Sequence, residues 1–315
     1  MNKEIRNIDL IIIGGGPAGL TSAMYASRAK LDILVLENAF IGGQVRSSYL
    51  IENYPGIKSI EGSKLADLLQ EQALEMGAKI DEFDFLQKVA LTDEEKNIET
   101  ESYIYKPKAV IISTGATPRK LPLKNEKRFS GKGIHYCAVC DGAMYEDKTV
   151  AVIGGGNSAL EEALFLTRFA KKVIMIRRYD YFKGQKSTLE EVLNHPKIEV
   201  LYNWDLMNVD GVNYVEKGIM RNTISGKTRE IAIDAVFGYI GTDPKTDLFK
   251  EVLNLSKGGY ILTDENMRTN IKGVYAAGDV REKKYRQITT AVSDGAIAAL
   301  DAEKYIEERG RESYV

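Results

Sequence analysis

The chain has 315 residues, of which 44% are hydrophobic and 28% are charged, and its formal net charge is -2. This balance is typical of a globular protein, and it excludes a disordered chain or a basic protein that coats nucleic acid. The N-terminus lacks the charge layout of a signal peptide, and no apolar run approaches the roughly 20 residues of a membrane helix. We therefore expect a cytoplasmic protein of about two domains, with no nucleic-acid or membrane partner.

The first predicted elements form a strand, a glycine turn and a helix. The segment IDLIIIGGGPAGL begins as a buried strand, and Gly14, Gly16 and Gly19 follow it in the spacing G-x-G-x-x-G before a helix that extends to about Lys30. These glycines permit a tight turn, the approach of a pyrophosphate and close helix packing. A second strand, LDILVLE, ends at Glu37, where a carboxylate can accept hydrogen bonds from ribose hydroxyls. The segment predicts a dinucleotide site.

The next feature is the cysteine pair Cys137 and Cys140, which are the only cysteines and have the spacing C-x-x-C. A structural disulfide is not expected in a reducing cytoplasm, so redox chemistry or metal binding should explain the pair. Zinc normally needs four ligands, and the two histidines, His135 and His195, are far apart in sequence. We interpret the pair as redox-active, the neighbouring Asp141 as its proton donor or acceptor, and both histidines as surface or packing residues.

A second strand, glycine turn and helix follow in KTVAVIGGGNSALEEALFL. Gly154, Gly156 and Ala159 have the spacing G-x-G-x-x-A between an apolar strand and an amphipathic helix. The pattern predicts a second mononucleotide-binding fold, although a Rossmann-shaped domain that no longer binds its nucleotide remains an alternative.

Taken together, these motifs and GGQ, IENYPG, STGA, CAVCDG and AAGDV with RQITTA resemble the low-molecular-weight thioredoxin reductases over nearly the whole chain. The resemblance implies an α/β fold with two Rossmann-like domains, the second inserted into the first. The FAD-binding domain would comprise residues 1–117 and 244–315, and residues 118–243 would form an NAD(P)H-like domain with the redox-active cysteines. A homodimer is also implied.

The family also implies a role for individual residues. Reduced FAD would reduce the disulfide through Cys140, with Asp141 exchanging a proton, and Cys137 would then attack the disulfide of thioredoxin. The residues near FAD would be Gly14, Gly16, Gly19, Glu37, Gly43, Gln44, Asn53, Thr114, Gly115, Gly278, Asp279, Arg286, Gln287 and Ala291. Domain rotation would let the cysteines serve both FAD and thioredoxin, with hinges near 116–118 and 241–244.

The chain departs from the family where its NADPH-dependent members bind the 2′-phosphate. The family's His-Arg-Arg-x-x-x-Arg is replaced by Arg177, Arg178, Tyr179 and Lys183, so three of the four residues differ. Tyrosine cannot form a bidentate fork and lysine is only a point charge. Possible nicotinamide-nucleotide residues are Gly154, Gly156, Ala159, Arg177, Arg178 and Lys183.

NADP(H) use is therefore uncertain, and we slightly favour reduced ferredoxin as the electron donor, as in some clostridial relatives. An ordinary NAD(P)H-dependent thioredoxin reductase is the alternative enzyme. A flavin-binding redox sensor is the non-enzymatic alternative.

Overall fold

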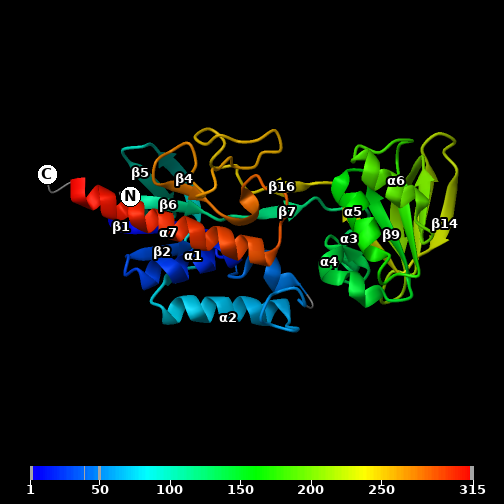
Figure 1. Ribbon diagram of the computed structural model, residues 1–315, viewed down its shortest axis with the longest axis horizontal. Helices are drawn as coiled ribbons and strands as arrows, with labels where there is room; N and C mark the ends of the chain where they lie inside the picture. Colours follow the sequence, from blue (N-terminus) through cyan, green and yellow to red (C-terminus); the bar gives the residue numbers. More distant parts are fainter. Residues whose placement is uncertain (1–2, 39, 49–50, 313–315) are drawn as a thin grey trace. The chain divides into compact units, whose positions relative to one another are not determined.

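The computed structural model describes residues 3–38, 40–48 and 51–312. The chain divides into two compact units (Figure 1), unit 1 with residues 1–117 and 243–315 and unit 2 with residues 118–242. The division falls one residue before the second boundary expected from the sequence. In the described ranges, no helix is long and apolar enough to cross a membrane.

Unit 1 is built on a sheet with the strand order β3-β2-β1-β6-β5-β4, and β17 also pairs with β6. Its strands are β1 (Glu4–Ile13), β2 (Ile33–Leu36), β3 (Lys79–Asp81), β4 (Leu86–Leu91), β5 (Lys96–Thr100), β6 (Tyr103–Ile112) and β17 (Val274–Ala276). Its helices are α1 (Pro17–Arg28), η1 (Gly43–Ser47), α2 (Gly62–Glu75), η3 (Gly278–Val280) and α7 (Ile288–Glu312). The parallel pairing of β2, β1, β6 and β17 is the arrangement that buries apolar strands on both faces.

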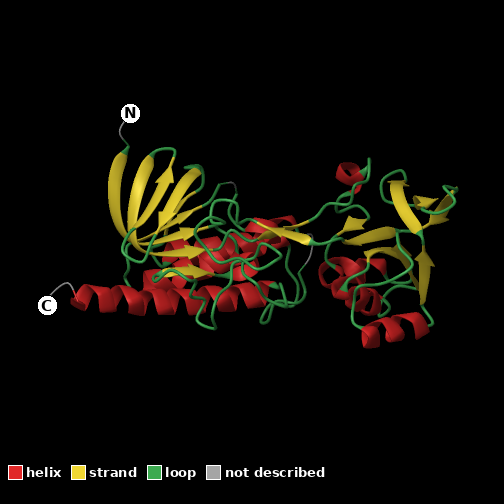
Figure 2. Cartoon of the chain, turned by 90° about the horizontal axis from the view of Figure 1, so that it is seen from above, coloured by secondary structure: helices red, strands yellow, loops and turns green. Residues whose placement is uncertain are grey.

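The two faces of this sheet have separate apolar cores. On one face, alternate residues such as Leu10 and Ile12 of β1 pack with α1 and α7. On the other face, Ile11 and Ile13 pack with the segment that contains Phe249. The long helix α7 runs along the sheet (Figure 2), and the closely packed α1 and α7 cover the face to which Leu10 and Ile12 of β1 belong.

Unit 2 contains a parallel sheet with the order β11-β10-β9-β15-β8 and an antiparallel sheet with the order β12-β13-β14. Its strands are β8 (Ile134–His135), β9 (Thr149–Gly154), β10 (Lys172–Arg177), β11 (Ile198–Tyr202), β12 (Trp204–Asp210), β13 (Lys217–Asn222), β14 (Thr228–Ala232) and β15 (Ala235–Tyr239). Its helices are α3 (Glu126–Phe129), α4 (Ala138–Asp141), η2 (Gly142–Tyr145), α5 (Asn157–Leu166) and α6 (Lys186–Asn194). The two units are joined through paired strands β7 (Ala116–Pro118) and β16 (Thr242–Pro244).

Candidate active site

The first glycine turn lies between β1 and α1, and its three predicted glycines have different surroundings. A Cβ on Gly14 would collide with the carbonyl of Ser113, and one on Gly19 would collide with the carbonyl of Gly14. A Cβ on Gly16 would meet no heavy atom within 4 Å. Gly14 and Gly19 therefore allow the backbone to pack, whereas Gly16 leaves open space beside the start of α1, as the pyrophosphate role requires.

The other predicted residues of the N-terminal segment gather around this turn. The Glu37 carboxylate accepts a hydrogen bond from the Gly15 N–H at 2.8 Å, and the Gly42 N–H donates to the Gly15 carbonyl at 2.8 Å. Next to Gly42, a Cβ on Gly43 would lie 3.4 Å from the Cα of Gly16.

Thr114 and Gly115 lie where β6 leads into β7, and the side chain of Gln44, from η1, reaches the same place. The Gln44 amide donates to the carbonyl of Ala116, and the Thr114 hydroxyl donates to the Lys245 carbonyl at 2.8 Å. The Gly115 carbonyl accepts from the Lys245 N–H at 3.0 Å. These contacts join the strand ends of the N-terminal and C-terminal segments of unit 1.

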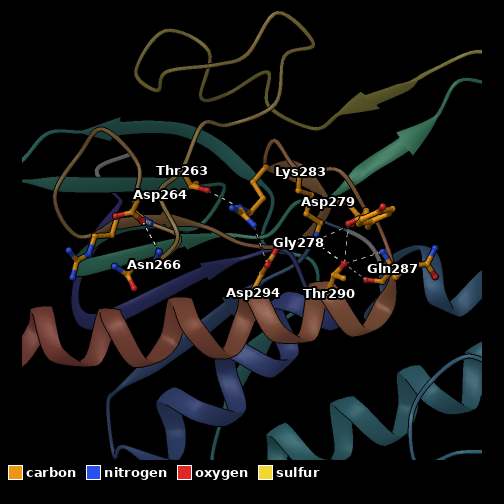
Figure 3. Close-up of polar contacts among 12 residues, drawn as sticks. Thr263, Asp264, Asn266, Gly278, Asp279, Lys283, Gln287, Thr290 and Asp294 are labelled. Atoms are coloured by element: carbon orange, nitrogen blue, oxygen red, sulfur yellow. Dashed lines mark hydrogen bonds and ion pairs between the residues drawn. The ribbon is translucent and has the colours of Figure 1, made fainter. Parts of the chain in front are cut away.

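The C-terminal segment contributes a group of charged side chains, which Figure 3 shows. Asp294, on α7, accepts hydrogen bonds from the Gly278 N–H at 3.0 Å and from the Lys283 ammonium at 2.9 Å. The Arg281 guanidinium donates to the other Asp294 oxygen at 3.3 Å. Gly278 has φ of +79°, and a Cβ there would lie 2.9 Å from that of Ala18 on α1. Asp294 therefore ties the AAGDV turn to α7, and the missing side chain of Gly278 lets this turn lie close to the start of α1.

Two buried polar atoms of this segment fit a bound cofactor. The Asp279 Oδ1 atom and the Arg286 Nε atom are buried, and neither has a hydrogen-bond partner among the described residues. Burial raises the pKa of the Asp279 carboxyl, although Lys283 and Arg286 oppose this shift. Lys283 forms only a long ion pair of 3.9 Å with Asp279 Oδ1. A buried polar group without a hydrogen bond is costly, so both atoms fit the contacts of a bound polar ligand. A polar cofactor such as FAD would satisfy both.

Asn53 and Gln287 lie far apart in sequence but close together in the fold. The Asn53 amide donates to the Gln287 side-chain oxygen at 3.2 Å. One turn later on α7, the Ala291 N–H donates to the Gln287 carbonyl at 3.0 Å. The predicted FAD residues of both segments thus belong to one region of unit 1.

The cysteine pair lies in unit 2, where β8 leads into α4. Cys137 and Cys140 form a disulfide with an S–S distance of 2.10 Å, and both residues are partly buried. The Cys140 N–H donates to the Cys137 sulfur at 3.2 Å. An N–H directed at this sulfur favours its thiolate once the disulfide is reduced. Cys137 is therefore suited to attack another disulfide.

Asp141 follows the pair, and its carboxylate contacts a histidine that we interpreted as an ordinary packing residue. The His135 Nδ1 atom lies 3.2 Å from Asp141 Oδ2, and its Nε2 atom lies 2.7 Å from the Tyr145 hydroxyl. His135 is only 5% exposed. The one local signal for this contact is that His135 lies two residues before Cys137, and our prediction from the sequence did not use it.

A second tyrosine holds the turn from the other side. The Tyr239 hydroxyl, at the end of β15, accepts a hydrogen bond from the Ala138 N–H at 2.6 Å. Burial, together with the nearby Glu162 carboxylate, raises the pKa of Tyr239 well above its usual range. Glu162 lies on α5, and burial with the neighbouring Glu161 raises its pKa to about 7.

The second glycine turn joins β9 to α5 and is open at Gly156, where a Cβ would meet nothing within 4 Å. The turn is covered at Gly155, because a Cβ there would lie 2.5 Å from the Arg177 guanidinium carbon. In addition, the Lys183 N–H donates to the Gly155 carbonyl at 2.7 Å. Ala159, the last residue of the motif, is fully buried.

The cations at the end of β10 make internal contacts. The Arg177 guanidinium donates to the Tyr181 carbonyl at 2.8 Å and lies over the rings of Tyr179 and Tyr181 at 4.9 and 5.6 Å. Arg178 pairs with Asp205 at 3.0 Å. Both arginines predicted near a nucleotide phosphate are thus engaged by the protein itself.

Comparison with known proteins places this geometry in a family. Residues 8–295 match the family described as pyridine nucleotide-disulphide oxidoreductase. The chain belongs to this family. It is 52% identical over 304 residues to the 34.2 kDa protein in the rubredoxin operon of Clostridium pasteurianum, a match that covers 96% of this chain and 99% of that protein. It is 42% identical over 306 residues to the thioredoxin reductase of Peptoclostridium acidaminophilum, with 95% and 97% covered.

A solved structure gives the same result. The thioredoxin reductase from Streptococcus pyogenes MGAS5005 has a TM-score of 0.89 and 39% sequence identity, and the match covers 96% of this chain and 99% of that chain. The predicted family resemblance and the α/β fold with two Rossmann-like domains are confirmed. Membership identifies the chain as a flavin-dependent oxidoreductase with FAD as its flavin.

Proposed function

We propose that this chain reduces the disulfide of a thioredoxin through Cys137 and Cys140. The disulfide in the turn between β8 and α4 is the observation that carries the proposal. Support also comes from relatives that carry the name thioredoxin reductase and match nearly the whole chain. Bound FAD supplies the electrons that open this disulfide.

The contacts of the turn support a role for each residue in the exchange. Cys137 would act as the attacking thiolate, because its sulfur accepts the Cys140 N–H. Cys140 would then resolve the mixed disulfide, and Asp141 would hold the proton that leaves the Cys140 thiol. In unit 1, the open space at Gly16 and the unsatisfied atoms of Asp279 and Arg286 support the predicted FAD residues.

For the electron donor we propose reduced ferredoxin rather than NAD(P)H. The Arg177 guanidinium covers Gly155 and stacks on Tyr179, while Arg178 pairs with Asp205. A 2′-phosphate would have to displace these contacts and would find no bidentate partner in Tyr179. The open Gly156 favours the alternative, an ordinary NAD(P)H-dependent enzyme. Homodimerisation and a cytoplasmic location stay predictions.

The donor is tested by anaerobic bleaching of the bound flavin with NADPH, NADH and photoreduced ferredoxin in separate reactions. We expect rapid bleaching with ferredoxin and slow bleaching with either nucleotide. Fast bleaching by NADPH would refute the ferredoxin proposal and leave the disulfide reductase intact.

The reductase activity is tested in the same reactions by adding thioredoxin and counting its thiols. Cys137→Ser and Cys140→Ser variants should bind FAD and bleach normally but should not reduce thioredoxin over repeated turnovers. Bleaching without thioredoxin reduction in the unsubstituted protein would indicate a flavin-binding redox sensor instead.

A further inference from the structure

His135, Asp141 and Tyr145 form a continuous polar chain beside the redox disulfide. The distances are 3.2 Å from His135 Nδ1 to Asp141 Oδ2 and 2.7 Å from His135 Nε2 to the Tyr145 hydroxyl. The side chain of His135 is 4% exposed and that of Asp141 is 17% exposed. Two hydrogen-bonding contacts on a buried imidazole leave it little freedom to rotate.

Aromatic packing fixes the plane of the imidazole. The His135 ring stacks on Phe237 of β15, with centroids 5.3 Å apart and an angle of 27°. Tyr145 meets Phe237 edge-on at 5.8 Å and His135 at 5.4 Å. The three rings therefore hold both imidazole nitrogens in line with their polar partners.

The chemistry of Tyr145 selects one arrangement of protons. Burial, with Asp141 as the next cause, raises the pKa of the Tyr145 phenol above its usual range, so it keeps its proton. A Tyr145 O–H that donates to Nε2 leaves the proton of a neutral imidazole on Nδ1, from which it donates to the Asp141 carboxylate.

We propose that His135 is a positioning residue for the proton exchange of the cysteine pair, because its Nδ1–H, fixed by the Tyr145 hydroxyl on Nε2, orients the Asp141 carboxylate. The inference rests on the proposed disulfide reductase activity. The imidazole of His135 faces two titratable groups, Asp141 from α4 and Tyr145 from η2, whereas Phe237 of β15 carries no charge. Asp234 and Tyr214 also act electrostatically on Tyr145.

The reaction of the reduced cysteine pair with its substrate is a thiol–disulfide exchange. The Cys137 thiolate attacks the substrate disulfide, which forms a mixed disulfide and releases one substrate thiolate. The Cys140 thiol gives its proton to Asp141, attacks the Cys137 sulfur and releases the second substrate thiolate. The enzyme dithiol is oxidised by two electrons, the substrate disulfide is reduced by two, and the proton on Asp141 passes to a product thiolate.

The test compares His135→Phe, which keeps an aromatic ring on Phe237, with the conservative His135→Gln. The control is His195→Gln, because His195 is only half-buried, lies in the same unit and is the only other histidine. Each holoenzyme is reduced with dithiothreitol, desalted anaerobically and mixed with the aromatic disulfide 5,5′-dithiobis(2-nitrobenzoate) across a range of pH. The thiolate released in one turnover is followed by absorbance.

We expect His135→Phe to lower the exchange rate about tenfold or more and to change the pH profile, since it removes a hydrogen bond to a charged group. His135→Gln should recover part of the rate, because its amide can still donate to Asp141. His195→Gln should match the unsubstituted protein. A His135→Phe profile equal to that of the unsubstituted protein overturns the inference, whereas no exchange by the unsubstituted protein overturns the proposed function instead.

A measurement on the unsubstituted chain keeps the inference testable if His135→Phe does not fold. Nitrogen-15 NMR of the two histidine side chains, assigned with His195→Gln, reports which ring nitrogen of His135 carries the proton. We expect a single Nδ1–H tautomer in the oxidised holoenzyme, because this is the tautomer that donates to Asp141. Rapidly averaged tautomers, or a single Nε2–H tautomer, contradict the inference.

Discussion

At the scale of single residues, Glu162 combines burial with a missing partner. Its Oε2 atom is buried, and no described residue forms a hydrogen bond with it. Burial and Glu161 raise its pKa from 4.5 to about 7. The folded protein therefore holds this proton more tightly than the unfolded chain does. The stabilisation that the protonated Glu162 carboxyl contributes to the fold is complete below about pH 4.5 and is lost as the pH rises through about 7.

Glu162→Gln should remove this pH dependence, because the amide cannot ionise. Between pH 5 and pH 8, the unsubstituted protein should lose about 2 kcal/mol of free energy of unfolding through this group, and Glu162→Gln should not show this loss. Urea unfolding followed by the fluorescence of Trp204, the single tryptophan and a residue of unit 2, measures it. The exposed Glu161→Gln is the matched control and should change the unfolding free energy much less. An equal pH dependence in Glu162→Gln contradicts the expectation.

Residue patterns predicted the glycine turns and the cysteine pair, because these depend on local backbone geometry. The close packing at Gly14 and Gly19 illustrates this. The contact between His135 and Asp141 was not predictable in the same way, because it requires the turn from β8 into α4 to fold back on itself. The hydrogen bond between Asn53 and Gln287 joins residues 234 positions apart and has no local signal.

At the scale of elements, α1 and α7 approach each other closely at Gly295. A Cβ on Gly295 would collide with the Ala18 carbonyl. The Ser22 hydroxyl donates to the carbonyls of Ala18 and Gly295 at 2.9 and 3.0 Å. This contact anchors α7 against the helix that follows the first glycine turn, and Asp294 is the preceding residue on α7.

Gly295→Ala should separate α1 from α7 and lower the free energy of unfolding of unit 1 by about 1–3 kcal/mol through overpacking. The measurement is the temperature at which bound flavin is released, followed by its fluorescence. Gly310→Ala, in the same helix, is the control, because a Cβ there would meet nothing within 4 Å. Release at an unchanged temperature in Gly295→Ala would show that the helices tolerate the added methyl group.

Apolar runs and glycine breaks predicted the strands and helices around both turns, with the first helix ending at Arg28 rather than at about Lys30. The antiparallel sheet of β12, β13 and β14 was not predicted, because its short strands alternate with polar residues and have no glycine motif. The pairing of β17 with β6 is a long-range contact that no local pattern encodes.

At the scale of the whole molecule, the predicted FAD residues belong to unit 1, whereas Trp204 and the cysteines belong to unit 2. Added FAD should therefore raise the urea midpoint for flavin release and leave the Trp204 transition unchanged. An excess of 100 times the dissociation constant should stabilise unit 1 by about 2.7 kcal/mol. Equal shifts of both transitions would show that the units unfold as one.

The insertion of unit 2 between β6 and β17 has a consequence for biosynthesis. Val110 of β6 pairs with Val274 of β17, and all of unit 2 lies between them in the sequence. A ribosome therefore finishes the cysteine-bearing unit while the surrounding unit still lacks a strand and its longest helix. Because domains fold as units during translation, the inserted part can become native first. The nascent flavin-binding part must stay unaggregated until α7 has been synthesised.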